Sequence, residues 1–405
     1  MDNIDEIVLA GAKGKQKFKK PRNLSKLQIA GQYIKGKYEI RFNEVSCKVE
    51  CRKKESTDNF TELNENNIYI ELESNHYDIS TAKLKALLHS DFIESYNPFV
   101  HYFNSLTVWY QDTDKDYIEA LCAYIPTKDP ERFKTQFRKM LVRCIACAIE
   151  DKVFNKHAFV LIHEKQNSGK STFCRWLCPP FLKDYITENI NTDKDSLIAL
   201  ANNFFINMDE LATLSKYDLN TLKSIISKDK INVRLPYEAR ATVKPRRANF
   251  VGSTNKDEFL TDETGSVRWL CFELTEKINF DYSKDIDIND IWRQAYSLYR
   301  DGFKYQLTTD ELEENENANR QFTMISQEME LIPKLYRRAT KEKHDLFLTA
   351  SDILNEISKN NYTLKSNNNS VGKALKMLGF YKGSLYDNEA QMSVKGYYVF
   401  TIPQK

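Results

Sequence analysis

The stretch "LIHEKQNSGKSTF", residues 161–173, restricts the fold of this chain more than any other feature. A short apolar run leads into a polar loop, and Gly169, Lys170 and Ser171 then open a run with helical character. This order of strand, glycine-lysine-serine and helix is the context of a phosphate-binding loop, G-x-x-x-x-G-K-[ST]. Glu164 stands where that pattern has its first glycine. Since the first glycine mainly permits a tight turn, we expect Glu164 to weaken phosphate affinity without abolishing it.

Apolar runs and helical segments alternate between residues 151 and 305. The runs "HAFVLIHE", "ANNFFINMDEL", "ANFVGSTN" and "VRWLCFEL" predict strands, and "KSTFCRWLCPPF" predicts a helix ended by Pro179. This alternation is typical of a sheet with helices on both faces, so we expect an α/β domain.

Polar residues stand at the ends of these expected strands, in the order that nucleotide hydrolysis requires. Asp209 would complete a Mg²⁺ shell and Glu210 would activate water, while Asn255 would sense the γ-phosphate. Arg268 is a candidate arginine finger that works across a subunit interface. The predicted metal ligands are the hydroxyl of Ser171 and the carboxylate of Asp209. The predicted ATP-binding residues are Asn167, Ser168, Gly169, Lys170, Ser171 and Thr172.

A basic segment lies between the acidic pair and Asn255. Residues 228–247 carry seven basic and two acidic side chains, in a chain of net charge +2. "INVRLP" and "ARATVKP" predict a hairpin, which is either a solvated surface or a grip on a phosphate backbone; some of its arginines could instead face ATP across an interface. The candidate DNA-binding residues are Lys228, Lys230, Arg234, Tyr237, Arg240, Lys244, Arg246 and Arg247.

Composition indicates an ordinary soluble protein of 405 residues, which we expect in the cytoplasm with no membrane partner. No run of 18 apolar residues and no leader pattern is present in the sequence. Cys144 and Cys147 have C-x-x-C spacing inside an apolar helical pattern. A buried helix face explains them more simply than zinc or redox chemistry, because no second cysteine or histidine pair accompanies them.

The flanking segments predict further modules. We expect a flexible basic tail over 1–28, with loose DNA contact as the functional alternative, and a small α+β module over 29–95. A helical region over 96–150 would precede the ATPase at 151–305. An acidic helical linker over 306–345 would lead to two helices and a hairpin over 346–405, an order that suggests a winged helix.

The ordered segments "QNSGKSTF", "MDEL" and "RLPYEARATVKPRRANFVGSTNKDEFLTDETGSVRW" resemble the virulence-associated E family, a branch of AAA+ ATPases similar to superfamily-3 helicases. The resemblance covers residues from about 95 to 300. It implies a central AAA+ (P-loop) sheet, flanked by the small α+β module and a C-terminal winged-helix-like domain as seen in such proteins from Bacteroidetes. The family commonly has glycines at the positions of Glu164 and Asn167, and a doubled arginine where only Arg268 remains.

This resemblance implies an ATP- and Mg²⁺-dependent DNA helicase or translocase that serves replication of a phage or mobile genetic element. ATP would bind between the subunits of a homo-oligomeric ring, a hexamer, on single-stranded or forked DNA. A separate primase is a further partner, because residues 1–95 carry no acidic cluster of the primase type. The alternative is an ATP-switched initiator, regulator or defence protein that assembles on DNA without unwinding it. A degenerate ATPase acting as a scaffold is the third hypothesis.

Overall fold

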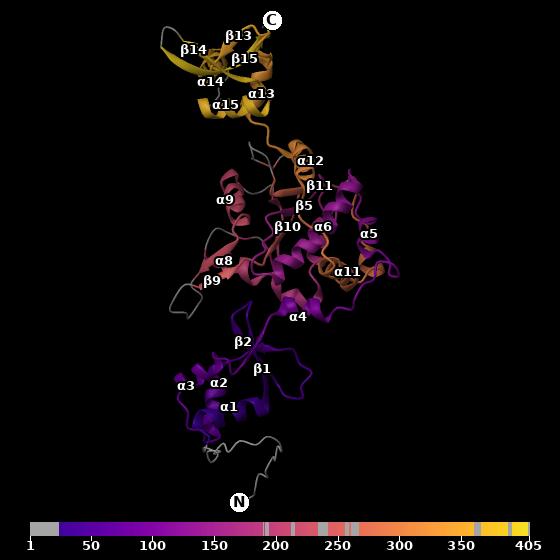
Figure 1. Cartoon of the computed structure of the whole chain (residues 1–405), viewed down its shortest axis with the longest axis vertical. Coiled ribbons are helices and arrows are strands. Elements are labelled where there is room, and N and C mark those ends of the chain that lie inside the picture. The colour runs from indigo at the N-terminus through magenta and orange to yellow at the C-terminus, as the bar shows by residue number, and fades with distance from the viewer. Residues whose placement is uncertain are drawn as a thin grey trace, which may run out of the picture. The chain divides into compact units, whose positions relative to one another are not determined.

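The computed structural model describes residues 24–188, 190, 194–211, 215–233, 242–255, 259–260, 267–359, 366–387 and 391–403. The chain divides into two compact units, residues 1–98 and 99–405 (Figure 1). Within the described ranges, each helix is too short or too polar to cross a membrane.

The first unit has a four-stranded sheet of order β3-β2-β1-β4 and its own apolar core. Residues 38–53 form an antiparallel hairpin, and the side chain of Ser80 caps the helix that begins at Thr81, in agreement with the predicted α+β module. A helix begins at Lys26, inside the segment predicted as a flexible tail, because Ser25 and Gln28 form a capping box. The elements are α1 Lys26–Lys37, β1 Tyr38–Asn43, β2 Lys48–Lys53, β3 Thr61–Glu62, α2 Glu65–Ser74, α3 Thr81–Leu88 and β4 Glu94–Tyr96.

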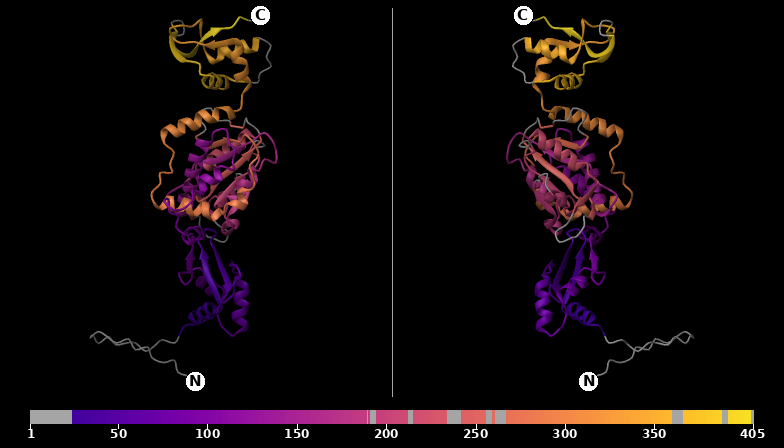
Figure 2. Two further views of the ribbon diagram at one scale, coloured as in Figure 1. Left: turned by 90° about the vertical axis from the view of Figure 1, so that its right-hand side faces the viewer. Right: turned by 90° about the vertical axis from the view of Figure 1, so that its left-hand side faces the viewer.

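A parallel five-stranded sheet of order β11-β5-β10-β7-β6 forms the centre of the second unit, with helices on both faces (Figure 2). The prediction of an α/β domain is confirmed at this level, and the four predicted strands are present. The three-residue strand β6 was not predicted. The strands are β5 Ala158–Ile162, β6 Ile186–Glu188, β7 Phe205–Met208, β10 Asn249–Thr254 and β11 Trp269–Glu273.

The strand order determines where a ligand can bind. From β5 the chain crosses to β6 at one edge of the sheet, whereas from the neighbouring β10 it crosses to β11 at the other edge. In open α/β sheets, ligands bind beyond the carboxyl ends of the two strands at such a reversal. In this chain the loop after β5 and the residue after β10 lie at that place.

Helices from both ends of the second unit complete its core. Phe133 and Phe137 of α6 stack at 5.4 Å and pack against Phe159 of β5. Asn315 of α12 donates to the carbonyl of Trp269 at the start of β11. The elements are α4 Pro98–Ser105, α5 Tyr117–Cys122, α6 Pro130–Ile149, α7 Lys170–Trp176, η1 Pro180–Tyr185, α8 Lys194–Asn202, α9 Lys216–Ile226, α10 Tyr282–Asp285, α11 Ile288–Arg300, α12 Thr309–Asn319 and η3 Arg320–Phe322.

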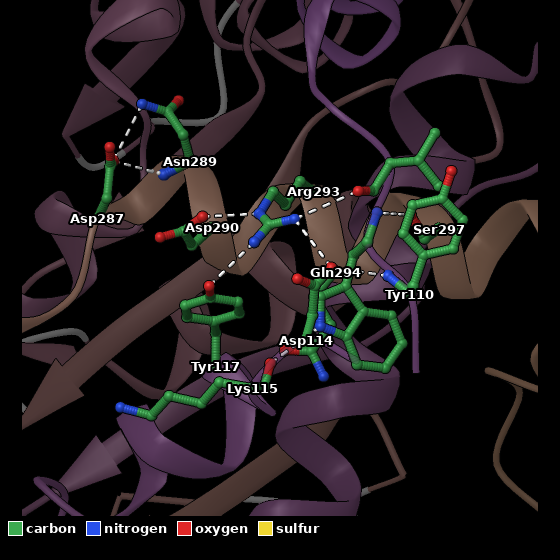
Figure 3. Close-up of polar contacts among 12 residues, drawn as sticks. Tyr110, Asp114, Lys115, Tyr117, Asp287, Asn289, Asp290, Arg293, Gln294 and Ser297 are labelled. Atoms are coloured by element: carbon green, nitrogen blue, oxygen red, sulfur yellow. Dashed lines mark hydrogen bonds and ion pairs between the residues drawn. The ribbon is translucent and has the colours of Figure 1, made fainter. Parts of the chain in front are cut away.

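Helix α11 packs against residues 108–118, a segment that precedes the sheet in the chain (Figure 3). The guanidinium of Arg293 donates to Asp290 on its own helix, to the Tyr117 hydroxyl at 2.9 Å and to the Val108 carbonyl at 3.3 Å. Gln294 accepts from the backbone N–H of Ile118. Residues 108–118 of the predicted helical region therefore pack against α11 within the second unit.

The last part of the chain has helices α13 to α15 and a strand, β15, that pairs antiparallel with β12, β13 and β14. Two helices followed by a hairpin occur in the predicted order; the winged-helix assignment stays a prediction. The elements are α13 Gln327–Leu335, β12 Tyr336–Arg338, β13 Leu346–Leu348, α14 Ala350–Lys359, α15 Asn368–Met377, β14 Lys382–Asp387 and β15 Met392–Thr401.

Candidate nucleotide-binding site

The loop between β5 and α7 turns at two residues with positive φ. Asn167 has a φ of 55° and Gly169, the N-cap of α7, has a φ of 90°. A Cβ at Gly169 would lie 2.9 Å from the ring of Phe280, so both backbone and packing require glycine. Glu164 is exposed and lacks a positive φ, so this loop does not need a glycine there.

Lys170 begins α7 and points back into the loop. Its Nζ donates to Ser168 Oγ at 2.8 Å, to the His163 carbonyl at 3.2 Å and to Asn255 Oδ1 at 2.8 Å. Only 5% of the residue is exposed. Burial lowers the pKa of Lys170, and the charge of Asp209 opposes that change. A buried ammonium at a helix N-terminus, beside backbone N–H groups, can bind phosphate oxygens.

The hydroxyl of Ser171 lies one residue further along α7 and meets the end of β7. It donates to Asp209 Oδ1 at 2.6 Å and lies 3.0 Å from the hydroxyl of Ser253, which also bonds to Asp209. Burial acts to raise the pKa of Asp209, but the hydrogen bonds from Ser171 and Ser253 outweigh it, so the pKa is lowered. A hydroxyl beside an ionised carboxylate is an oxygen donor set that fits Mg²⁺.

Glu210 follows Asp209 and also lies at the carboxyl ends of the strands. It has a φ of 54°, and its backbone N–H donates to Asp209 Oδ1 at 3.1 Å. The strained backbone turns the chain sharply after β7, and the side chain of Glu210 is exposed. The structure thus brings together, at the carboxyl ends of the strands, five residues predicted from three separate segments: Lys170, Ser171, Asp209, Glu210 and Asn255.

Sequence reasoning missed three residues here: Ser253, Arg175 and Glu188. Ser253 stands two residues before Asn255, and Arg175 stands four residues after Ser171 on the same helix face. Those spacings were available signals. Arg175 donates to Glu188 at 2.7 Å and to Asp209 at 3.3 Å. Glu188 could not be found from a pattern, because its strand has only three residues.

Arg268 directly precedes β11, so it lies at the amino ends of the parallel strands, whereas the residues above lie at the carboxyl ends. Its carbonyl accepts from the N–H of Ala158, the first residue of β5, and its Nε donates to Ser227 Oγ at 2.7 Å. The four-residue length between Ala158 and Ile162 spans about 13 Å of strand. Within one chain, Arg268 is therefore not brought to Lys170.

A family model described as "Virulence-associated protein E-like domain" matches residues 104–324, more than half of the chain. The chain belongs to this family. The matched region contains β5, β7, β10 and β11 with all the residues described above, and it extends further on both sides than the ATPase predicted over 151–305.

Several solved structures resemble this family member, and no curated protein matches it. "The apo structure of NrS-1 C terminal region (305-718)" is 11% identical with a TM-score of 0.48, covering 93% of this chain and 100% of that chain. "The A form apo structure of NrS-1 C terminal region-CTR(305-718)" is 12% identical with a TM-score of 0.45, covering 87% and 86%. Likeness at this level says nothing of what the chain does.

Strands β8 Lys230–Val233 and β9 Thr242–Pro245 pair antiparallel and form the predicted basic hairpin. Lys228 and Lys230 are exposed. Arg234, Tyr237 and Arg240 lie outside the described residues. Lys244, Arg246 and Arg247 are 9%, 0% and 9% exposed.

The interpretation of Arg246 and Arg247 as DNA-facing residues is therefore corrected. Arg246 donates to the carbonyl of Ile226 at the end of α9, at 3.1 Å. Arg247 donates to the carbonyl of Ala148 at the end of α6, at 2.7 Å. Both guanidiniums satisfy the free carbonyls of helix C-termini and anchor the base of the hairpin. Lys244 is buried too, so it does not belong to the exposed basic residues of the hairpin.

The cysteine pair on α6 is buried, as predicted. Cys144 and Cys147 are 0% exposed, and burial raises the pKa of both thiols. Cys147 Sγ lies 3.5 Å from the carbonyl of Arg246. Cys147 therefore packs α6 against the base of the hairpin, whereas the Cys144 thiol contacts Met140 on its own helix.

Proposed function

We propose that this chain binds ATP with Mg²⁺ at the carboxyl edge of its central sheet and hydrolyses it. The observation that carries the proposal is the buried Nζ of Lys170, held at the N-terminus of α7 by Asn255 from the neighbouring strand. The oxygens that accept hydrogen bonds from this ammonium are neutral, so among the described residues its charge is not balanced by an acidic side chain in direct contact. It suits a ligand that brings its own negative charge.

The residues present fit the parts of a phosphoryl-transfer site. Lys170 and the N–H groups of the loop would bind the phosphates, and Ser171 and Asp209 would hold Mg²⁺. Bound Mg²⁺ supplies charge stabilisation to the phosphate oxygens. Glu210 would orient the attacking water, and Asn255 would contact the γ-phosphate through its amide.

We further propose that Arg268 acts on ATP bound to a neighbouring copy in a ring. Arg268 lies at the amino ends of the strands, away from Lys170 of its own chain, which supports this proposal. A head-to-tail contact between two copies joins two different surfaces of the same chain. Such a contact could bring the Arg268 edge of one copy against the Lys170 edge of the next. A closed head-to-tail ring, with a hexamer as our expected size, follows from repetition of this contact.

The proposed use of ATP hydrolysis is movement along DNA, and duplex unwinding, during replication of a phage or mobile element. Exposed Lys228 and Lys230 at the root of the hairpin support contact with a phosphate backbone. The C-terminal helices and hairpin would add a second, winged-helix-like DNA contact. A separate primase remains a proposed partner.

A strand-displacement assay with a forked duplex tests this proposal, with Lys170→Ala as the inactive control. We expect ATP-dependent opening by the wild type alone. ATP hydrolysis stimulated by single-stranded DNA with no opening would favour the initiator or regulator instead. Absence of nucleotide binding in the presence of Mg²⁺ would contradict both functions and leave the scaffold hypothesis.

A further inference from the structure

Arg175 is shared between two carboxylates at the edge of the candidate metal site. Its Nε donates to Glu188 Oε1 at 2.7 Å, and its Nη2 lies 3.3 Å from both Glu188 Oε2 and Asp209 Oδ2. Asp209 is also the residue that accepts from Ser171. The guanidinium therefore lies directly beside the proposed Mg²⁺ ligands, with its shortest contact to Glu188.

Glu188 is held in place from the sheet. Its Oε2 accepts from Asn207 Nδ2 at 2.8 Å, and Asn207 is fully buried. The parallel pairing of β6 and β7 puts Glu188 beside Asn207, and Asp209 follows two residues later. The two carboxylates that face Arg175 are thus fixed by neighbouring strands, whereas Arg175 reaches them on a long and half-exposed side chain.

A cation that pairs closely with Asp209 would compete with Mg²⁺ for the same carboxylate. Two bonds to Glu188 offset that competition, because they take up most of the donors that Arg175 turns toward this edge. We propose that Glu188 is a positioning residue that limits Arg175 to one long contact with Asp209, through Nη2, and so keeps Asp209 available to Mg²⁺. This inference rests on the proposed nucleotide site, and it adds a residue to that site.

Once Glu188 is lost, we expect Arg175 to weaken Mg²⁺ binding by Asp209. In Glu188→Gln the carboxylate charge disappears, and we expect Arg175 to move onto Asp209. In Arg175→Ala no cation remains to compete. The double variant should therefore bind Mg²⁺ better than Glu188→Gln alone, although it lacks both side chains. A direct role of Glu188 as a metal ligand predicts equal losses in Glu188→Gln and in the double variant, because both lack the same carboxylate.

The test is titration of each full-length variant with Mn²⁺, followed by electron paramagnetic resonance, in the presence of a non-hydrolysable ATP analogue. We expect Glu188→Gln to weaken Mn²⁺ binding about tenfold, the usual effect of a residue that supports a metal ligand. Arg175→Ala and the double variant should lie near the wild type. Glu131→Gln, which removes a carboxylate exposed on α6, is the matched control and should change nothing.

Analogue binding without metal separates this inference from the proposed function. We expect it to be equal in the wild type and in all four variants, since none of them touches Lys170. No analogue binding by the wild type would contradict the proposed function. Wild-type binding with unchanged Mn²⁺ affinity in Glu188→Gln, or with equal losses in Glu188→Gln and the double variant, would overturn the role of Glu188.

Discussion

The Nζ of Lys170 lies 2.8 Å from Oδ1 of Asn255, and this contact joins the first residue of α7 to the residue that follows β10. It links the carboxyl ends of the two neighbouring strands, β5 and β10, whose connections leave in opposite directions. The two residues are separated by 85 positions in the chain.

We expect Asn255→Ala to lower kcat for ATP about 100-fold and to change nucleotide affinity little. The amide would stabilise charge on the γ-phosphate only as the bond breaks, which is how an oriented donor contributes to catalysis. Steady-state ATPase assays and equilibrium binding measure the two quantities. Equal losses of kcat and affinity would show that Asn255 only holds Lys170.

Gly169→Ala should destabilise the protein more than Gly302→Ala, which is the matched control. Gly169 and Gly302 have φ values of 90° and 78°, but a Cβ at Gly169 would lie 2.9 Å from Phe280 and 3.2 Å from Ile278, whereas a Cβ at Gly302 would meet nothing within 4 Å. The shared backbone cost is about 1–2 kcal/mol, and the contact adds to it. Urea unfolding of both variants gives the difference. Phe280→Ala should reduce that difference to the part that the Ile278 contact contributes, and an undiminished difference would refute the packing explanation.

Arg268→Ala should bind nucleotide as the wild type does and fail to hydrolyse it. Mixing it with Lys170→Ala, also inactive, should restore up to about a quarter of wild-type activity, because a quarter of randomly formed head-to-tail contacts combine the two intact residues. ATPase assays across mixing ratios test this. Activity that stays at zero in every mixture would contradict action between subunits.

His157 predicts a pH effect on stability. Burial first, and then the charge of Arg143, lower the pKa of His157 to about 2, so the folded state keeps it neutral. Below its ordinary pKa of about 6.5 the unfolded chain takes up a proton that the folded chain refuses, so stability falls as pH falls. The loss is about 1.4 kcal/mol per pH unit. His157→Leu should flatten urea-unfolding stability between pH 6 and pH 4; parallel curves would contradict the assignment.

The central sheet was predictable because its signals are local. Each predicted strand is a short apolar run that ends in polar residues, and Asp209 and Asn255 keep that pattern at the carboxyl edge. Strand β6 escaped because three residues carry no periodicity. Strand order and direction depend on pairing between distant segments. Arg268 precedes β11, so its place at the amino ends of the strands became clear only once β11 was seen to run parallel to β5.

The basic hairpin shows where a count of charges misleads. Arg246 and Arg247 add two charges to the segment, yet both are buried and donate to carbonyls at the ends of α9 and α6. No linear pattern reveals that a guanidinium will meet a helix C-terminus 20 or 99 residues earlier in the chain. The same limit hid Glu188, the partner of Arg175, although the spacing of Arg175 from Ser171 was visible in the sequence.

The binding of an ATP analogue with Mg²⁺ to the full chain, measured by calorimetry, tests the central claim most directly. The account predicts one site per chain, with affinity reduced by about 10- to 100-fold in Lys170→Ala because a charged hydrogen-bond donor is lost. Lys165→Ala removes an exposed lysine of the same loop and should bind as the wild type does. Binding by the wild type that survives unchanged in Lys170→Ala, or no binding at all, would contradict the account.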